Sequence, residues 1–309
     1  MLKKIPLFIL GLLIFTATIA MLRPSLVVPK ALVRKELEQP NSKYFSWKGN
    51  MIHYVDEGQG IPVLMIHGFG GSHYNFQKLS ELMKDKYRVI RVDLPGFGLS
   101  DFPKDEQDYA TMYRSFVADF VNRLEIDSVY VMGNSMGGGI AWLYTLDHPE
   151  KVKGLVLLDA FGYDAEVIRK EVLRGARLSF LSPFLKKGLP ITISRKTQLQ
   201  CYEDDSMVND DVVNRSNRFW NAEGNIDAFL SLASYSNFPT EENIKKILTP
   251  TLIVWGKQDA IIPAEHATHF HQDIKNSTVV LLDHCGHVPM AEKPDSVLQA
   301  FVSFEKSLK

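Results

Sequence analysis

The chain has 309 residues, enough for one large α/β domain, with or without an inserted subdomain, to bury a full core. Lysine and arginine number 35 against 36 acidic residues, so the formal net charge is −1 and no global field attracts nucleic acid. The two cysteines, Cys201 and Cys285, lie far apart without metal-ligand spacing, which argues against a disulfide framework and a bound metal.

The N-terminus contains an uncharged apolar run. After two lysines, residues 5–22 carry no charge, and Arg23 and Pro24 end the run. A run of 18 residues is near the lower limit for a helix that spans a bilayer. We expect an uncleaved single-pass membrane anchor over residues 1–24, with a cleaved signal peptide, and hence secretion, as the alternative. Basic residues on both sides of the run leave the membrane orientation open.

The next segment, residues 25–43, is basic and holds three prolines around a short helical pattern at 31–38. Its composition indicates a spacer between the anchor and the folded body. Two β-rich runs follow at 44–48 and 51–56. Turn residues at 49–50 separate them, which predicts a hairpin.

Continuous apolar runs, typical of strands covered on both faces, recur along the rest of the chain. They lie at 63–67, 88–93, 128–132, 155–159, 252–255 and 279–282. Amphipathic helical patterns stand between most of them, for example at 112–124 and 140–148. This alternation predicts an α/β fold, with a mostly parallel sheet and helices on both faces.

One connection is much longer than the others. Roughly 90 residues separate Asp159 from Leu252, and they contain helical patterns but no clear buried strand. We interpret them as an inserted helical cap over residues 161–243, which divides the core into residues 44–160 and 244–309. The first half of the cap is basic and apolar. We expect its apolar residues to pack onto the core, and contact with anionic lipid is the alternative.

The most informative motif is Gly-Asn-Ser-Met-Gly at 133–137, where an apolar run passes into a helical pattern. It is typical of a nucleophile elbow, a sharp strand-to-helix turn that exposes the serine hydroxyl and needs glycine where a Cβ would collide with its neighbours. Ser135 is therefore the candidate nucleophile. A serine hydroxyl needs a positioned base, and the base needs an acid that fixes its tautomer and stabilises the imidazolium.

Two later strand ends supply these partners. The run at 252–255 leads into a turn that ends at Asp259, and the run at 279–282 leads into a turn that ends at His287. The order Ser, Asp, His is that of an open α/β-hydrolase arrangement. We therefore expect a catalytic triad of Ser135, Asp259 and His287.

Other residues compete for two of these roles. Asp159 also ends a strand and is the alternative acid, and His284 is the alternative base. We favour His287 because a glycine before it and a proline shortly after it suit a constrained, exposed loop. Asp93 and Asp283 are interpreted as loop-closing or capping residues.

Acyl transfer also needs two backbone N–H donors for the oxyanion, each worth about 3 kcal/mol where one has been removed in other enzymes. One is expected from Met136, which follows the nucleophile, and the other from Phe69 in the glycine-rich loop at 67–71. A phosphate-cradling loop is the alternative for these glycines, but the loop lacks the Lys-Ser/Thr ending of a P-loop. We expect no cofactor.

On these motifs the chain resembles the α/β-hydrolase superfamily over nearly all of its length after Tyr44. The matching segments lie at 52–58, 67–70, 93–100, 133–137, 255–259 and 286–287. Within the superfamily the chain is similar to the membrane-anchored monoacylglycerol lipases and related bacterial lipases and esterases, by its apolar N-terminus, Trp-Gly-Lys-Gln-Asp at 255–259 and Cys-Gly-His at 285–287. The resemblance implies hydrolysis of carboxylic esters of lipid-like substrates through an acyl-enzyme on Ser135. Neither the motifs nor the resemblance indicates an oligomeric state.

Four other classes share parts of this pattern. Carbon–carbon bond hydrolases of ring-cleavage products have the same elbow, but usually carry tryptophan directly after the catalytic histidine, where this chain has Val288. Haloalkane dehalogenases and epoxide hydrolases use an aspartate nucleophile, so Ser135 argues against both. A ligand-sensing protein on the same fold is disfavoured because all three triad residues are retained.

Overall fold

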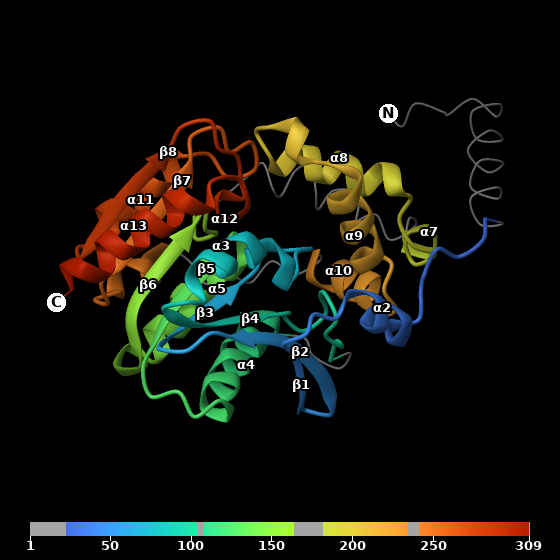
Figure 1. Ribbon diagram of the computed structural model, residues 1–309, viewed down its shortest axis with the longest axis horizontal. Coiled ribbons are helices and arrows are strands. Elements are labelled where there is room, and N and C mark those ends of the chain that lie inside the picture. Colours follow the sequence, from blue (N-terminus) through green and yellow to red (C-terminus); the bar gives the residue numbers. More distant parts are fainter. Residues whose placement is uncertain (1–22, 104–107, 164–181, 234–240, 309) are drawn as a thin grey trace, which may run out of the picture.

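The protein is described by a computed structural model, which covers residues 23–103, 108–163, 182–233 and 241–308 (Figure 1). Its centre is an eight-stranded sheet in the order β1-β2-β4-β3-β5-β6-β7-β8. The strands are β1 (Ser42–Trp47), β2 (Asn50–Glu57), β3 (Ile61–Ile66), β4 (Tyr87–Val92), β5 (Val129–Asn134), β6 (Val152–Leu158), β7 (Thr251–Gly256) and β8 (Ser277–Leu282). β2 is antiparallel to both of its neighbours, and every later pairing is parallel. The predicted fold class is confirmed.

The strands alternate their side chains between two hydrophobic clusters. In β7, Ile253 belongs to one cluster, whereas Leu252 and Val254 belong to the other, as expected for side chains that point to opposite faces. The central strands β5 and β7 are buried at every residue, which is why their sequences are continuously apolar. β8 differs: it is an edge strand in which only Leu282 is buried, so the prediction that it is covered on both faces is wrong.

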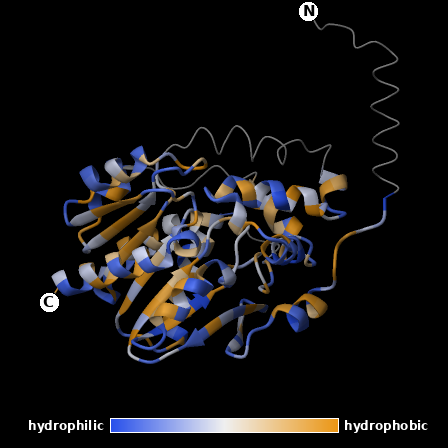
Figure 2. Ribbon diagram, turned by 45° about the horizontal axis from the view of Figure 1, so that its top comes forward, coloured by the Kyte–Doolittle hydropathy of each residue, from blue (hydrophilic) through white to orange (hydrophobic). Residues whose placement is uncertain are grey.

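Helices cover both faces of the sheet (Figure 1). The core helices are α3 (Gln77–Met83), α4 (Tyr109–Arg123), α5 (Met136–Asp147), α11 (Glu265–Asp273), α12 (Pro289–Glu292) and α13 (Pro294–Ser307), with short 3-10 turns η1 (His73–Phe76), η2 (Pro149–Lys151) and η5 (Glu241–Lys246). Phe116 of α4 and Trp142 of α5 pack in one cluster, and Phe301 of α13 packs in the other. In Figure 2 apolar residues follow much of the sheet's strands.

In the described part of the chain between β6 and β7, four helices stand apart from the sheet, in the region predicted to be a cap (Figure 1). They are α7 (Ser182–Leu185), α8 (Ile191–Cys201), α9 (Asp210–Trp220) and α10 (Asn225–Ala233), with the 3-10 turn η4 (Asp205–Met207). Asn217 joins α9 to α8 through hydrogen bonds to Ser194 Oγ at 2.9 Å and to the carbonyl oxygen of Leu189 at 3.0 Å. Part of the basic first half of the predicted cap, residues 164–181, lies outside the described residues.

The segment predicted to be a spacer is packed against these helices. Its helix α2 (Lys30–Leu37) is followed directly by β1. The Arg23 guanidinium donates to the carbonyl oxygens of Phe184 at 2.7 Å and Gly188 at 2.6 Å, and Arg218 of α9 pairs with Glu36 of α2 at 2.7 Å. The N-terminal end of the described chain is thus fixed to the cap.

The expected membrane anchor falls almost entirely on residues 1–22, which lie outside the described residues. Among the helices of the described ranges, none combines the length and the apolarity that a bilayer crossing requires.

Candidate active site

Ser135 stands on a sharp turn between β5 and α5. Its backbone is in the left-handed region, with φ 54° and ψ −123°, which is uncommon for a residue with a side chain. A Cβ on Gly133 would lie 2.2 Å from the Gly137 carbonyl oxygen, and a Cβ on Gly137 would lie 2.2 Å from the Ile66 carbonyl oxygen. Only glycine fits at these two positions, so the motif is required by the close approach of β3, β5 and α5.

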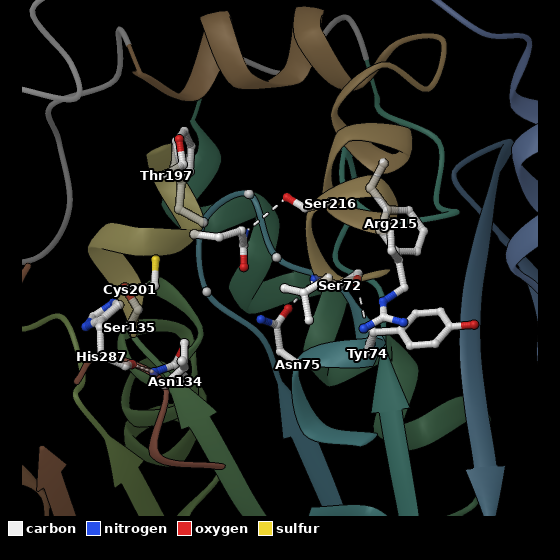
Figure 3. A pocket seen from close by; sticks show the side chains of 18 of the residues that line it. Ser72, Tyr74, Asn75, Asn134, Ser135, Thr197, Cys201, Arg215, Ser216 and His287 are labelled. Carbon is white, nitrogen blue, oxygen red and sulfur yellow. Dashed lines mark hydrogen bonds between the residues drawn. The ribbon is translucent and has the colours of Figure 1, made fainter. Parts of the chain in front are cut away.

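The candidate base and acid are in direct contact. His287 Nδ1 and Asp259 Oδ2 are 2.7 Å apart, and the Asp259 carboxyl has no solvent exposure. The other carboxyl oxygen, Oδ1, accepts backbone N–H bonds from Ile261 at 2.7 Å and Ile262 at 3.0 Å. With Nδ1 donating to Asp259, the imidazole keeps Nε2 available as a proton acceptor. Ser135 and His287 line the same pocket (Figure 3).

The loops that carry the acid and the base are bonded to each other. The Gln258 side-chain oxygen accepts the backbone N–H of Cys285 at 3.1 Å, and the Gln258 backbone N–H donates to the Cys285 carbonyl at 3.0 Å. A Cβ on Gly256 would lie 2.1 Å from the Gly286 carbonyl oxygen. The motifs at 255–259 and 285–287 therefore occur together because they form one interlocked pair of loops.

Two residues that sequence reasoning did not single out position the base loop. Asn134 Nδ2 donates to the carbonyl oxygens of Leu158 at 3.1 Å and His287 at 3.0 Å. Glu292 accepts the backbone N–H of Gly286 at 2.9 Å on one oxygen, and that of Glu203 in the cap at 2.9 Å on the other. Burial raises the pKa of Glu292, against the lowering effect of these donors. The only sequence signal was the polar residue before the candidate nucleophile, because every partner here is a main-chain atom, and main-chain atoms leave no pattern in the sequence.

The loop that carries Phe69 adjoins the candidate nucleophile. A Cβ on Gly68 would lie 2.9 Å from Ser135 Cβ. Leu94 N–H donates to His67 Nε2 at 3.1 Å, so His67 Nδ1 carries the hydrogen and donates to the Gly68 carbonyl oxygen at 2.7 Å. Burial lowers the pKa of His67, which favours this neutral form. The loop is thereby fixed beside Ser135.

The second candidate donor, Met136, is the first residue of α5. The N–H groups at the start of a helix have no partner within it, so they are available to a ligand. The Met136 N–H can therefore serve as one of the two donors, and the loop that carries Phe69 lies next to Ser135.

A pocket opens beside Ser135, between the loop after β3 and the cap helices α8 and α9 (Figure 3). Much of its wall is polar and includes Thr197, Gln198 and Ser216. Gln198 Nε2 donates to Ser216 Oγ at 3.1 Å and so links α8 to α9. The Arg215 guanidinium also lines the pocket and lies over the Tyr74 ring, 4.4 Å from its centroid.

An aromatic cluster joins the cap to the Phe69 loop. The Phe69 ring packs against Phe97 of the core, with centroids 5.5 Å apart, and against Phe229 of α10 at 5.2 Å. Phe229 in turn contacts Trp220 of α9 at 4.9 Å. Gly70 has φ 70°, and a Cβ there would lie 2.4 Å from the Trp220 ring. Movement of α9 or α10 would therefore disturb the loop next to Ser135.

The other candidates lie in different surroundings. The His284 side chain is 79% exposed, with Glu203 at 3.7 Å, and Asp283 pairs with Lys257 on the surface at 2.7 Å. Asp93 is buried, accepts the Leu99 N–H at 2.9 Å and closes its loop. It also contacts His53 Nδ1 at 2.8 Å and His73 Nδ1 at 3.0 Å. Asp159 is fully buried close to Asp259 and His287.

Comparison with known proteins shows the family to which the fold belongs. A family model for the α/β-hydrolase fold matches residues 61–294. The chain is 30% identical over 260 residues to the 2-hydroxy-6-oxo-6-(2'-aminophenyl)hexa-2,4-dienoic acid hydrolase of Metapseudomonas resinovorans, covering 81% of this chain and 86% of the relative. It is 30% identical over 274 residues to Lipase 1 of Psychrobacter immobilis, covering 84% and 82%. A crystal structure described as a membrane phospholipase A superposes with a TM-score of 0.71 at 26% identity, covering 98% of this chain and 99% of that one.

Proposed function

The chain belongs to the α/β-hydrolase fold family, and from that premise we propose that it is a serine hydrolase which cleaves carboxylic esters of lipid-like substrates through an acyl-enzyme on Ser135. The observation that carries this proposal is the Ser135 elbow in one pocket with His287, whose Nδ1 lies 2.7 Å from Asp259. The 30% identical Lipase 1 and the membrane phospholipase A structure support an ester substrate.

In the proposed reaction Ser135 Oγ attacks the ester carbonyl carbon while His287 Nε2 takes the hydroxyl proton. The carbonyl oxygen becomes an oxyanion and accepts the N–H groups of Phe69 and Met136. The carbon–oxygen bond to the alcohol then breaks, and His287 returns the proton to that leaving oxygen. Water repeats the sequence on the acyl-enzyme and releases the fatty acid. Asp259 stabilises the imidazolium form of His287 in both halves.

Arg215 favours a substrate with an anionic group. Within the described part of the chain, no carboxylate pairs with this guanidinium, although it lines the pocket beside Ser135. A phosphate on the alcohol part of a lipid ester would suit it better than the neutral glycerol of a monoacylglycerol.

The same arginine gives a second candidate function a specific basis. The carboxylate of a ring-cleavage dienoic acid would also suit Arg215, and the dienoic acid hydrolase of Metapseudomonas resinovorans is 30% identical. Carbon–carbon bond hydrolysis of such a substrate is therefore the alternative. Val288, where those hydrolases usually carry tryptophan, favours the ester.

We also propose that residues 1–24 anchor the protein in a membrane. The uncharged run at 5–22 leads directly to Arg23, which two cap carbonyls hold. Exposed apolar residues occur in the same region: Leu26 exposes 42% of its surface and bonds to the Lys187 carbonyl oxygen, and Ile191 and Ile193 of α8 each expose 45%. Carbonate extraction of membranes from expressing cells tests the anchor: the full chain stays in the pellet, and release into the supernatant would contradict it.

The ester proposal is tested with purified Ser135→Ala and the control Ser307→Ala, which changes an exposed serine near the C-terminus. Hydrolysis rates are measured on p-nitrophenyl esters, monoacylglycerols, lysophospholipids and a ring-cleavage dienoate. We expect the esters to be cleaved faster than the dienoate, and Ser135→Ala to lose about a thousandfold or more of the activity. Faster cleavage of the dienoate, or full activity in Ser135→Ala, would overturn the proposal.

A further inference from the structure

A second buried carboxyl lies beside the candidate triad. Asp159 ends β6, has no solvent exposure, and adopts a left-handed backbone with φ 45°. One polar atom each of Asp159, Asp259 and His287 lie within 4.8 Å of one another. Two carboxyl groups this close, and both shielded from water, cannot both carry a charge without a large electrostatic cost.

The hydrogen-bond donors are divided unequally between the two carboxyls. Asp259 receives backbone N–H bonds from Ile261 and Ile262 and also contacts His287 Nδ1. Asp159 receives a single N–H bond, from Gly256 at 3.0 Å on Oδ1. Within the described residues, Asp159 Oδ2 is buried with no donor directed at it. Donors stabilise the charged form, so the negative charge belongs on Asp259 and the proton on Asp159.

The groups that face Asp159 from the neighbouring elements strengthen this assignment. They are Asp259 from the loop after β7, Glu292 from α12, and His287 and the Cys285 thiol from the loop after β8. The largest electrostatic contributions at Asp159 come from Asp259, the Gly256 N–H and Glu292, and none of these is a lysine or arginine. Burial, followed by the charge of Asp259, raises the pKa of Asp159 well above its usual value.

We propose that Asp159 and Asp259 form a carboxyl pair that holds one proton, located on Asp159 Oδ2 and donated to the Asp259 carboxylate. Asp159 is then a positioning residue: it touches no substrate, but it orients Asp259 and withdraws part of the charge that His287 experiences. This inference rests on the proposed role of Asp259 as partner of His287 in a serine hydrolase.

The test measures the rate at which a fluorophosphonate labels Ser135 as a function of pH. The acidic limb of this profile follows protonation of His287 and does not depend on which substrate the enzyme prefers. Asp159→Asn replaces the O–H donor with an N–H donor of the same shape. We expect the midpoint of the limb to stay within about 0.3 pH units, because a neutral group has replaced a neutral group.

The opposite charge state predicts a different result. If Asp159 were ionised in the native enzyme, Asp159→Asn would remove a negative charge close to His287, and the midpoint would fall by about one pH unit or more. That shift would overturn the proposal. Asp159→Ala removes the donor altogether, so we expect its midpoint to rise. The control Asp283→Asn, on the surface beside Lys257, leaves the midpoint unchanged.

A second measurement uses the native protein and does not depend on how the variants fold. Infrared spectra of protein labelled with carboxyl-13C aspartate should contain a protonated-carboxyl band at pH 7, which an ionised pair would lack. Labelling at Ser135 without ester hydrolysis would contradict the proposed substrate class and leave the carboxyl pair in place. An ionised pair in an active esterase would contradict only the inference drawn here.

Discussion

Asn134 connects the nucleophile strand to the base loop, because its side-chain Nδ2 donates to the main-chain oxygen of His287 at 3.0 Å. The same nitrogen donates to the Leu158 carbonyl at the end of β6. One buried amide therefore sets the distance between the strand that ends in Ser135 and the loop that carries the base. The residue before the nucleophile is part of the positioning machinery.

Asn134→Ala should lower kcat about a hundredfold while the protein remains folded, because a displacement of about 1 Å between reacting groups costs this much. The measurement is kcat on a p-nitrophenyl ester, with circular dichroism to verify folding. Asn276→Ala, at an exposed asparagine just before β8, is the matched control and should match the parent. A folded Asn134→Ala enzyme with the parental kcat would show that the bond to His287 has no positioning role.

Two glycines of α5 give a matched pair for stability. A Cβ on Gly137 would lie 2.2 Å from a β3 carbonyl oxygen, whereas a Cβ on Gly139 would lie 3.3 Å from its nearest neighbour, the Phe161 carbonyl oxygen. We expect Gly137→Ala to lower the free energy of unfolding by roughly 3 kcal/mol. Gly139→Ala should change it by about 1 kcal/mol or less, since alanine favours the helix. Urea denaturation measures both, and equal losses would contradict the packing argument.

Arg215→Gln should raise KM about tenfold for an ester whose alcohol part carries a phosphate, because a charge-assisted hydrogen bond is lost. KM for a neutral ester of the same acyl length should change little. Arg218→Gln is the control: this arginine lies one helical turn further along α9 but pairs with Glu36 on the surface. If Arg215→Gln affects both esters equally, the arginine recognises no anionic group.

The buried cluster around Asp93 predicts how stability depends on pH. Burial lowers the pKa of His73 from 6.5 to about 4, so the unfolded chain binds more protons than the folded one between these values. The contribution of the neutral His73 side chain to the free energy of unfolding is full above about pH 6.5, and it is lost as the pH falls toward 4. Burial raises the pKa of Asp93, but His73 and His53 lower it more, so it lies well below 3.8. The stability that the charged Asp93 carboxylate provides is therefore also lost as the pH falls, at a lower pH than that of His73.

The free energy of unfolding should therefore fall between pH 7 and pH 4. Urea denaturation at each pH measures it. His73→Asn should reduce the slope, whereas His148→Gln, at a partly exposed histidine, should leave the slope unchanged. An identical slope in His73→Asn and the parent would mean that His73 does not titrate as proposed.

The sequence predicted the sheet because its strongest signals are local. Continuous apolar runs mark β3, β5 and β7, and the glycines around Ser135 mark a turn that admits no side chain. Parallel strands place their carboxyl ends at one edge, so three residues far apart in the chain were expected to meet there. The contact between His287 and Asp259, and the pocket that His287 shares with Ser135, are consistent with that expectation.

The parts that the sequence did not predict depend on how the chain is arranged in three dimensions. Glu292 acts on the N–H groups of Gly286 and Glu203, which have no pattern in the sequence. The exposure of β8 follows from its place at the edge of the sheet rather than from its apolar composition. In the sequence, Arg215 does not differ from the other basic residues of the cap. Only the position of α9 beside the pocket shows that its side chain lines it. The chemistry of the candidate side chains could be predicted from the sequence, but the groups that they contact could be identified only from the tertiary structure.

The most direct test of the central claim is mass spectrometry of the enzyme quenched with acid during turnover of a p-nitrophenyl ester. We predict an acyl adduct on the peptide that contains Ser135, present during turnover and lost when the substrate is exhausted. Asp259→Asn should form the adduct more slowly, because His287 would lose its carboxylate partner. An adduct on a different residue, or steady turnover by Ser135→Ala, would contradict the account.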